Sequence, residues 1–170
     1  MGSVREEIRQ TRPFSSVADE GLVTLMRTAD TVRRALSEVV AAHGITLQQY
    51  NVLRILRGAG PDGIATLDVA ARMIETTPGI TRLLDRLERK GLVRRRRCPR
   101  DHRRVLCSAS DTALDALRAL DRPMTETSRR VLGSLGVART RELIGLLDGA
   151  RGAASRLIAS DAGVGRRPCR

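Results

Sequence analysis

Apolar residues recur at steps of three and four positions along most of the chain, which is the spacing of a helix with one buried face. The first such stripe runs from Leu22 to Val40, and Ser16 followed by Asp19 has capping-box spacing at its start. Gly44 supplies a left-handed cap at its end. We therefore predict a long first helix, preceded by a flexible arm over residues 1–15.

The clearest helix start in the sequence comes next. Thr46 and Gln49 have the spacing of a capping box, and Ile45 before the cap is placed to pack on Tyr50 in the first turn. Apolar residues then follow one face until the glycine-rich stretch 58–63 ends the helix.

Two short helices that meet at a tight turn are predicted after this break. Thr66 is expected to cap the first of them, and Thr76-Thr77-Pro78 gives the second a hydroxyl cap followed by proline at the first helical position. The second helix should stop at Gly91. Its apolar face comprises Ile80, Leu83, Leu84 and Leu87. The pair has the geometry of a helix-turn-helix.

The pattern changes from helical to extended after these helices. Two runs, Leu92 to Arg97 and Arg103 to Ala109, flank a turn-rich basic stretch and predict a hairpin. The predicted fold class is therefore mainly α with a small β-hairpin wing, in the element order of a winged helix-turn-helix.

The rest of the chain again has a helical pattern. Ser110 should cap a helix that proline at position 123 kinks or breaks. A turn over residues 133–136 and a last helix over roughly residues 137–159 follow.

The net charge of +12 is concentrated in the helix-turn-helix and wing. Between Thr76 and Ser110, eleven basic residues stand against three acidic ones, which leaves +8 in this short segment. Such a charge attracts phosphate in DNA, in RNA or on an anionic membrane surface. No stretch approaches the roughly 18 consecutive apolar residues of a membrane span, and the charged N-terminus is not a signal peptide. We expect a cytoplasmic protein without a membrane partner.

Aromatic residues make up only 1% of the chain, so stacking of unpaired bases on aromatic rings is nearly unavailable. This favours double-stranded DNA, although an RNA- or ribosome-associated basic binding protein stays open as the alternative. Two histidines, three unevenly spaced cysteines and no glycine-rich phosphate loop provide no visible catalytic or metal site. We expect no enzyme activity, no metal and no cofactor.

The polar face of the second short helix is the predicted DNA-reading surface. Short residues near its start let the backbone approach phosphates and base edges, and the positive end of the helix dipole helps there. Arg82 and Arg86 are long enough to reach a guanine edge in the major groove. The short residues are Thr76, Thr77, Gly79 and Thr81. The alternative is an ordinary amphipathic helix with solvated charges.

The wing is the second predicted DNA contact. The four arginines Arg94 to Arg97 alternate faces on a strand, so about half of them can meet phosphate. Asp101 should pair with a neighbouring arginine and order the tip, which would direct Arg103 into the minor groove. The wing candidates are Arg95, Arg97, Arg100, Asp101 and Arg103. A solvated basic loop is the alternative.

These residues carry a family resemblance. The stretch Thr81 to Arg95, TRLLDRLERKGLVRR, followed by Asp101 to Leu106, DHRRVL, resembles the recognition helix and wing of the MarR (multiple antibiotic resistance regulator) family. The resemblance covers the whole order of elements. It implies a wing Asp-x-Arg pair and two arginines on the major-groove face, here Asp101 with Arg103, and Arg82 with Arg86.

The resemblance also implies a homodimer that binds a near-palindromic duplex, with half-sites roughly 10 base pairs apart. Repression is the commoner outcome in the family. The predicted organisation is a flexible arm (1–15), a single domain (16–160) with dimerisation helices (16–43 and 110–160) around a winged helix-turn-helix (46–109), and a disordered basic tail (161–170).

In the family, small phenolic or other amphipathic effectors often bind between the dimerisation helices and the DNA-binding lobe and change the spacing of the recognition helices. The candidate lining residues are Leu36, His43, Tyr50 and Leu53, for each of which a plain core or surface position is the alternative. Cys98 lies among arginines that favour a thiolate, so oxidation of the wing stays open, and Cys107 is expected to be a small apolar strand residue.

Overall fold

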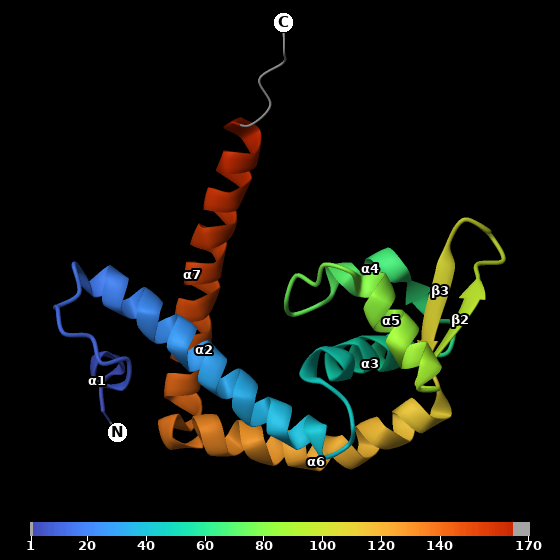
Figure 1. The fold of residues 1–170 in the computed structure, drawn as a ribbon, viewed down its shortest axis with the longest axis horizontal. Helices are drawn as coiled ribbons and strands as arrows, with labels where there is room; N and C mark the ends of the chain where they lie inside the picture. Colours follow the sequence, from blue (N-terminus) through green and yellow to red (C-terminus); the bar gives the residue numbers. More distant parts are fainter. Residues whose placement is uncertain (1, 165–170) are drawn as a thin grey trace, which may run out of the picture. The chain divides into compact units, whose positions relative to one another are not determined.

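The computed structural model describes residues 2–164, with side chains from residue 2 to residue 160 (Figure 1). The chain divides into two compact units, residues 1–127 and residues 128–170. None of the described helices is both long enough and apolar enough to cross a membrane. The elements are α1 (Val4–Glu7), α2 (Val17–Ala41), α3 (Leu47–Ala59), β1 (Ile64–Ala65), α4 (Thr66–Ala71), α5 (Ile80–Arg89), β2 (Val93–Arg97), β3 (Val105–Ala109), α6 (Asp111–Leu132), the 3-10 turn η1 (Gly133–Leu135) and α7 (Gly136–Val164).

The N-terminal segment holds more structure than the predicted arm over residues 1–15. It contains the single helical turn α1, and the Nε of Arg27 on α2 lies 3.4 Å from a carboxylate oxygen of Glu7. The flexibility of this arm stays a prediction.

The two predicted helix starts before the helix-turn-helix are confirmed. Ser16 Oγ accepts the N–H of Asp19 at 3.1 Å at the start of α2. At the start of α3 the N–H of Gln49 donates to Thr46 Oγ1 at 3.2 Å, and the N–H of Thr46 donates to Gln49 Oε1 at 3.0 Å. Both bonds of the capping box are therefore present. They satisfy the amide oxygen of Gln49, a side chain that is otherwise buried.

The recognition helix α5 starts later than predicted. Its capping residue is Gly79 in a left-handed conformation with φ +82°, and not a hydroxyl of Thr76-Thr77-Pro78. Thr77 Oγ1 instead donates to the carbonyl oxygen of Glu75 at 2.9 Å, so this hydroxyl stabilises the turn between the helices. Glycine adopts the left-handed cap conformation without strain, and the helix proper begins at Ile80.

The predicted wing forms, and a third strand joins it. β2 pairs with β3 antiparallel, with Arg95 opposite Cys107, and the strand order is β1-β3-β2. Ala65 pairs in β1 and also occupies the cap position of α4, so Thr66 is the first helical residue and not the predicted cap. Gly63 has φ +71°, and a Cβ on it would lie 2.5 Å from the carbonyl oxygen of Cys107. Only glycine fits this close approach between backbones.

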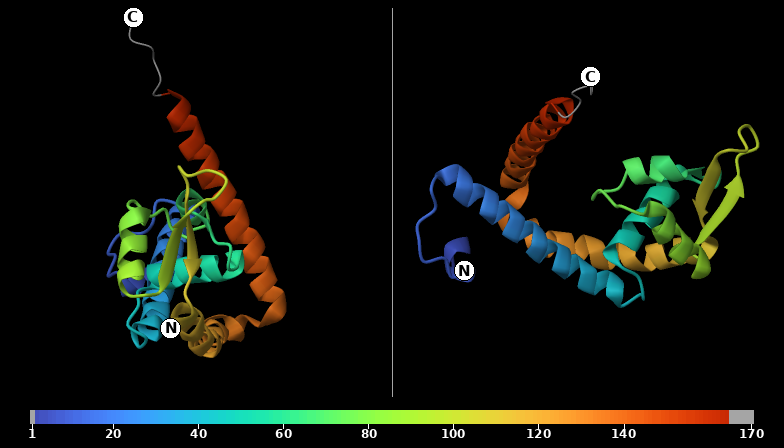
Figure 2. Two further views of the ribbon diagram at one scale, coloured as in Figure 1. Left: turned by 90° about the vertical axis from the view of Figure 1, so that its right-hand side faces the viewer. Right: turned by 45° about the horizontal axis from the view of Figure 1, so that its top comes forward.

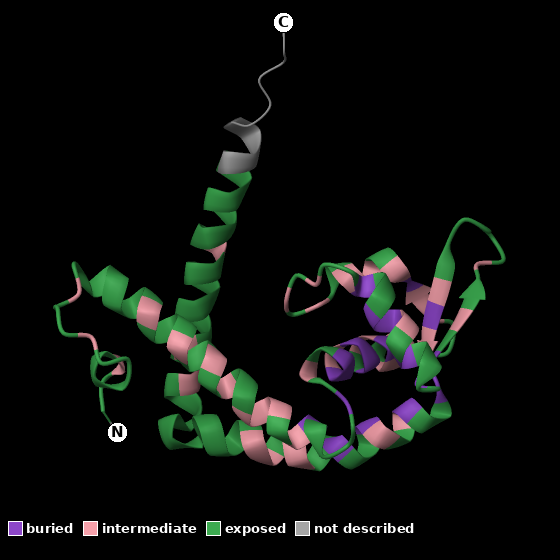
Figure 3. Cartoon of the chain, in the orientation of Figure 1, coloured by how far each residue is buried: buried purple, intermediate pink, exposed green. Residues whose placement is uncertain are grey.

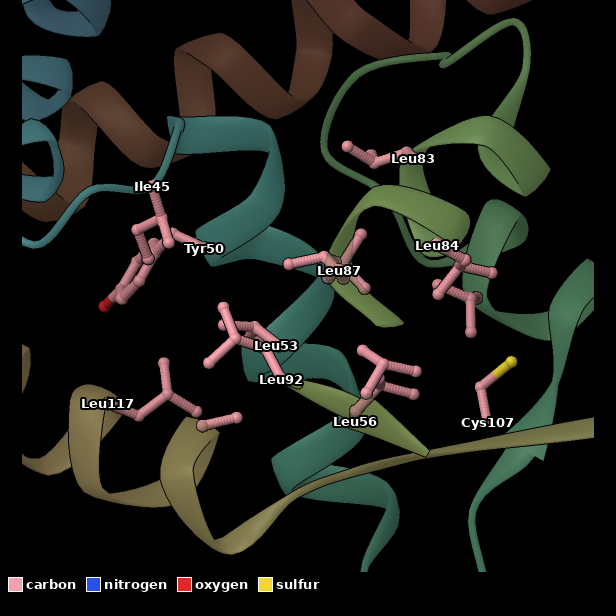
Figure 4. Close-up of a cluster of buried hydrophobic side chains, with 14 of the residues drawn as sticks. Ile45, Tyr50, Leu53, Leu56, Leu83, Leu84, Leu87, Leu92, Cys107 and Leu117 are labelled. Atoms are coloured by element: carbon pink, nitrogen blue, oxygen red, sulfur yellow. The ribbon is translucent and has the colours of Figure 1, made fainter. Parts of the chain in front are cut away.

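The hydrophobic core of residues 1–127 lies among α3, α5, the sheet and the first half of α6, where Figure 3 shows the buried positions gathered and Figure 4 shows their side chains. Cys107 is fully buried on β3, which confirms it as a small apolar strand residue. The N–H of Leu92 donates to the carbonyl of Leu87 at 2.9 Å, and Gly91 closes α5 with φ +70°, as predicted. The buried face of α5 is also as predicted: Ile80, Leu83, Leu84 and Leu87.

The C-terminal helices differ from prediction in their extent. Ser110 Oγ caps α6 as predicted, but the helix continues through Pro123, so the break that we considered there does not occur. α7 extends to Val164, five residues beyond the predicted end and into the segment predicted as a tail. The remainder of that tail, residues 165–170, lies outside the described residues.

One ion pair joins α3 to α6. Arg57 Nη1 donates to both carboxylate oxygens of Asp121, at 3.0 and 2.9 Å, and Nη2 donates to one of them at 3.0 Å. The hydrogen bond from Arg57 lowers the pKa of Asp121, and the same bond raises the pKa of Arg57. Because the side chains are 34% and 50% exposed, the pair stabilises the fold no more than a good surface pair does, about 1 kcal/mol.

We expect Asp121→Asn to lower the free energy of unfolding at pH 7 by about 0.5–1 kcal/mol. The folded pKa of Asp121 lies below its unfolded value of about 3.9. The stabilisation is therefore complete above the unfolded pKa and is lost as the pH falls through the folded pKa. Urea unfolding at a series of pH values measures this difference. Asp115→Asn, which removes a pair with Arg118 inside α6, is the control, and an equal loss in both variants would contradict the prediction.

Candidate nucleic-acid interface

α5 presents the polar face that the sequence predicted. Arg82 and Arg86 are exposed, and within residues 2–160 their guanidinium groups form no ion pair and no hydrogen bond. The apolar face of the helix is buried, so these two side chains project from the opposite flank. Of the predicted short residues, Thr76, Gly79 and Thr81 are exposed and Thr77 is half-buried. This face offers free cationic groups next to a helix start without bulky side chains.

The four consecutive arginines of β2 are not equivalent. Three are paired within the protein, whereas the exposed Arg97 forms no pair within the described part of the chain. Arg95, which the sequence placed among the DNA contacts, is directed at α5 instead. The pairs are Arg94 with Asp111 (2.7 Å), Arg95 with Asp85 (2.6 Å) and Arg96 with the carbonyl oxygen of Asp62 (2.9 Å).

The tip of the wing is closed by hydrogen bonds of its own, and the hairpin projects from the α3–α5 lobe in the right-hand view of Figure 2. Asp101 Oδ1 accepts the N–H of Arg103 at 3.0 Å, and the Asp101 carbonyl accepts the N–H of Arg104 at 2.9 Å. This corrects the expected pairing of Asp101 with an arginine side chain, because a carboxylate reaches an amide two residues ahead without ordering a long side chain. The guanidinium groups of Arg100 and Arg103 stay exposed and unpaired among the described residues. Oxidation of the half-buried Cys98 stays a prediction.

A pocket of about 350 Å³ opens between α2, the start of α3, the turn after α4, and α5. Leu47 and Met73 give it apolar walls, and Arg86 of α5 reaches it from the recognition helix. Arg33 of α2 also lines it and donates through Nε to Glu75 Oε1 at 2.7 Å. The ion pair of Arg33 with Glu75 therefore links α2 to the turn of the helix-turn-helix, beside a pocket lined by both apolar and polar residues.

None of the four predicted effector-site residues lines this pocket. Tyr50 and Leu53 are 5% and 0% exposed and belong to the core (Figure 4). His43 is exposed after the end of α2, and Leu36 is half-buried on α2. On α3 the pocket takes the first residues of the helix, whereas Tyr50 and Leu53 face inward. The predicted set therefore does not belong to this pocket, and its role in binding an effector stays a prediction.

Comparison with known proteins identifies the family. The family model of the MarR family matches residues 45–105, from just before α3 to the start of β3. The chain is 38% identical to a MarR transcription factor from Planctomyces limnophilus, whose crystal structure it matches over 80% of this chain and 98% of that chain with a TM-score of 0.61. The chain belongs to the MarR family.

Two further relatives widen the comparison. The homoprotocatechuate degradative operon repressor of Escherichia coli is 25% identical over 130 residues, which are 76% of this chain and 86% of that protein. MepR of S. aureus, solved as a complex with DNA, shares the fold at 22% identity, with a TM-score of 0.70 over 76% of this chain and 95% of that chain. As a member of the MarR family, the protein is a DNA-binding transcriptional regulator with a winged-helix fold.

Sequence reasoning missed two features of the site. They are the ion pair of Arg33 with Glu75 beside the pocket, and the contact of Arg95 with α5. Arg33 and Glu75 are 42 positions apart, so no local pattern joins them. For Arg95 a weak signal existed, because Asp85 and Glu88 are acidic residues on a helix of the most basic segment and favour a nearby cation.

The free and paired arginines of the wing provide a test of this MarR-family interface. Arg103 is unpaired, whereas Arg104 next to it donates to Asp68 Oδ2 at 3.1 Å. We expect Arg103→Ala to weaken binding to a duplex site by about tenfold or more, and Arg104→Ala to weaken it much less. Fluorescence anisotropy with labelled duplex measures both affinities, and thermal melting checks the fold. Equal losses would show that the pairing within the protein does not decide which arginine binds DNA.

Proposed function

We propose that this MarR-family regulator binds a near-palindromic duplex as a homodimer, with α5 in the major groove and the wing in the adjacent minor groove. The observation that carries the proposal is that, between Thr76 and Ser110, the guanidinium groups without a partner among the described residues lie on two neighbouring elements. They are Arg82 and Arg86 on α5 and Arg97, Arg100 and Arg103 on the wing. A helix in the major groove and basic side chains in a narrow minor groove are the matching modes of DNA recognition.

The homodimer is supported by apolar side chains that a single chain leaves uncovered. On α2, Leu22 and Met26 are 61% and 67% exposed. In residues 128–160 no described side chain is buried, and α7 exposes several large apolar residues. These are Val137, Ile144, Leu146, Leu147, Leu157 and Ile158. Apolar surface of this extent marks a protein interface, and a second copy related by a twofold axis also supplies the second recognition helix that a near-palindrome needs.

Repression is the direction of control that we propose. It is supported by the Escherichia coli relative, whose name makes it the repressor of a degradative operon. A dimer that occupies a site within a promoter blocks polymerase by exclusion and needs no further contact.

Selection of bound sequences from random duplex tests the proposal. We expect two inverted half-sites with centres roughly 10 base pairs apart, and sedimentation velocity should show a dimer both free and bound. An RNA-binding protein would instead prefer structured RNA over the selected duplex in direct competition. That preference, or a monomer in sedimentation, would refute the corresponding part of the proposal.

We further propose that a small amphipathic anion, such as a phenolic acid, binds the pocket beside α5 and releases the DNA. The lining of the pocket combines apolar residues with two arginines, Arg33 and Arg86. A carboxylate that binds Arg33 competes with Glu75 for this side chain and so loosens α2 from the turn before α5. Effector binding then changes where α5 is held, which is the population shift that release requires.

Homoprotocatechuate and simple hydroxybenzoates are suitable probes for this site. We expect at least one of them to release labelled duplex from the wild-type protein. Arg33→Met removes both the partner of the anion and the bond to Glu75, so it should bind duplex more weakly without any probe and respond little to added probe. Arg34→Met is the matched control, because Arg34 pairs with Asp30 on the same helix and does not line the pocket. Equal responses of the two variants, or no release by any probe, would refute this site.

A further inference from the structure

We propose that Arg95 is a positioning residue, which fixes the recognition helix α5 against the wing and does not itself contact DNA. The proposal rests on the proposed placement of α5 and the wing in adjacent grooves. Arg95 was predicted above to contact DNA. We now assign it instead to holding the residues that do contact DNA in their relative positions.

The guanidinium group of Arg95 spans almost two turns of α5. Nη1 donates to Asp85 Oδ1 at 2.6 Å, and Nη2 donates to the carbonyl oxygen of Thr81 at 3.2 Å. Nε lies 3.7 Å from a carboxylate oxygen of Glu88, near enough for attraction but too far for a hydrogen bond. The three partners follow one another at helical spacing along a single flank of α5, so one side chain of β2 holds that whole flank.

Burial separates Arg95 from its neighbours on the strand. Its side chain is 19% exposed, whereas those of Arg94 and Arg96 are 65% and 49% exposed. In the antiparallel ladder Arg95 stands opposite Cys107, which is fully buried, so both side chains lie on the inner face of the sheet. The Nε–H of Arg95 has no hydrogen-bond partner in the described chain, but it is buried between sheet and helix, where a phosphate does not reach it.

Charge gives the pairing a second consequence. Asp85 and Glu88 are two of the three acidic residues between Thr76 and Ser110 and lie on the helix that approaches DNA. Arg95 lies beside both carboxylates, so opposite charge as well as hydrogen bonding holds β2 against α5. The bonds to Asp85 and to the Thr81 carbonyl need the planar fork of arginine, and a lysine ammonium cannot reproduce them.

Arg95→Met and Arg97→Met form a matched pair, because both arginines lie on β2 and only Arg95 is paired. Affinity for the duplex recovered by selection is measured over a series of salt concentrations. We expect Arg95→Met to weaken binding about tenfold with an unchanged salt slope, since no phosphate contact is lost. Arg97→Met should flatten the slope by about 0.9 for each phosphate contact that it removes. A flatter slope for Arg95→Met, or unchanged affinity, would overturn the proposal.

Hydrogen exchange of the protein without DNA gives a readout that does not depend on the proposed grooves. We expect faster exchange in β2 and in the second half of α5 for Arg95→Met, and wild-type exchange for Arg97→Met. Arg95→Lys keeps the charge and most of the aliphatic part of the side chain. It is the second variant for this experiment if Arg95→Met does not fold. It should show the same local loosening with a melting temperature close to wild type. Wild-type exchange in β2 and α5 of the lysine variant would refute positioning even if DNA binding is confirmed.

Discussion

Burial of Ile80, Leu83, Leu84 and Leu87 fixes the rotation of α5 about its own axis. Each of these side chains contributes about 1.5–3 kcal/mol when it leaves water, so turning the helix by even a quarter of a turn would expose several of them at once. The opposite flank, with Arg82 and Arg86, therefore faces outward without any contact of its own. The core therefore sets which face of α5 stays free for a partner, and the bonds from Arg95 to one flank of the helix add to this hold.

The distribution of charge shows why net charge alone does not define a DNA-binding surface. Arg94, Arg95, Arg96 and Arg104 all lie in the most basic segment, yet each is engaged with an oxygen of the protein itself. Those pairs attach the wing to α6, α5, the loop before β1, and α4. Within this segment, the arginines without a partner among the described residues lie on the outer face of α5 and towards the tip of the hairpin. Internal pairs set the scaffold, and the remaining cations supply the attraction for phosphate.

How much of this was predictable depends on how local each interaction is. The capping box of Thr46 and Gln49 and the buried face of α5 involve residues within a few positions, so spacing alone predicted them. The capping of α5 by Gly79 was missed because Thr77 forms its hydrogen bond within the turn. The direction of Arg95 depends on how β2 packs on α5, and the pair of Arg33 with Glu75 depends on α2 reaching the turn. Periodicity says which face of an element is buried, but not which element buries it.

The same limit explains why sequence reasoning did not find this pocket. Tyr50 and Leu53 are residue types that often line ligand sites, but at their positions on α3 both are buried in the core that supports α5. The first turn of α3 is different, because Thr46, Leu47 and Gln48 line an opening together with residues of α2 and of the turn before α5. A ligand in this opening would also act directly on the proposed DNA-binding surface. Arg86 belongs both to the lining of the opening and to the outer surface of α5. The effect of a ligand at this position would not have to be transmitted through the core, because the ligand would touch α5, the helix proposed to read the DNA.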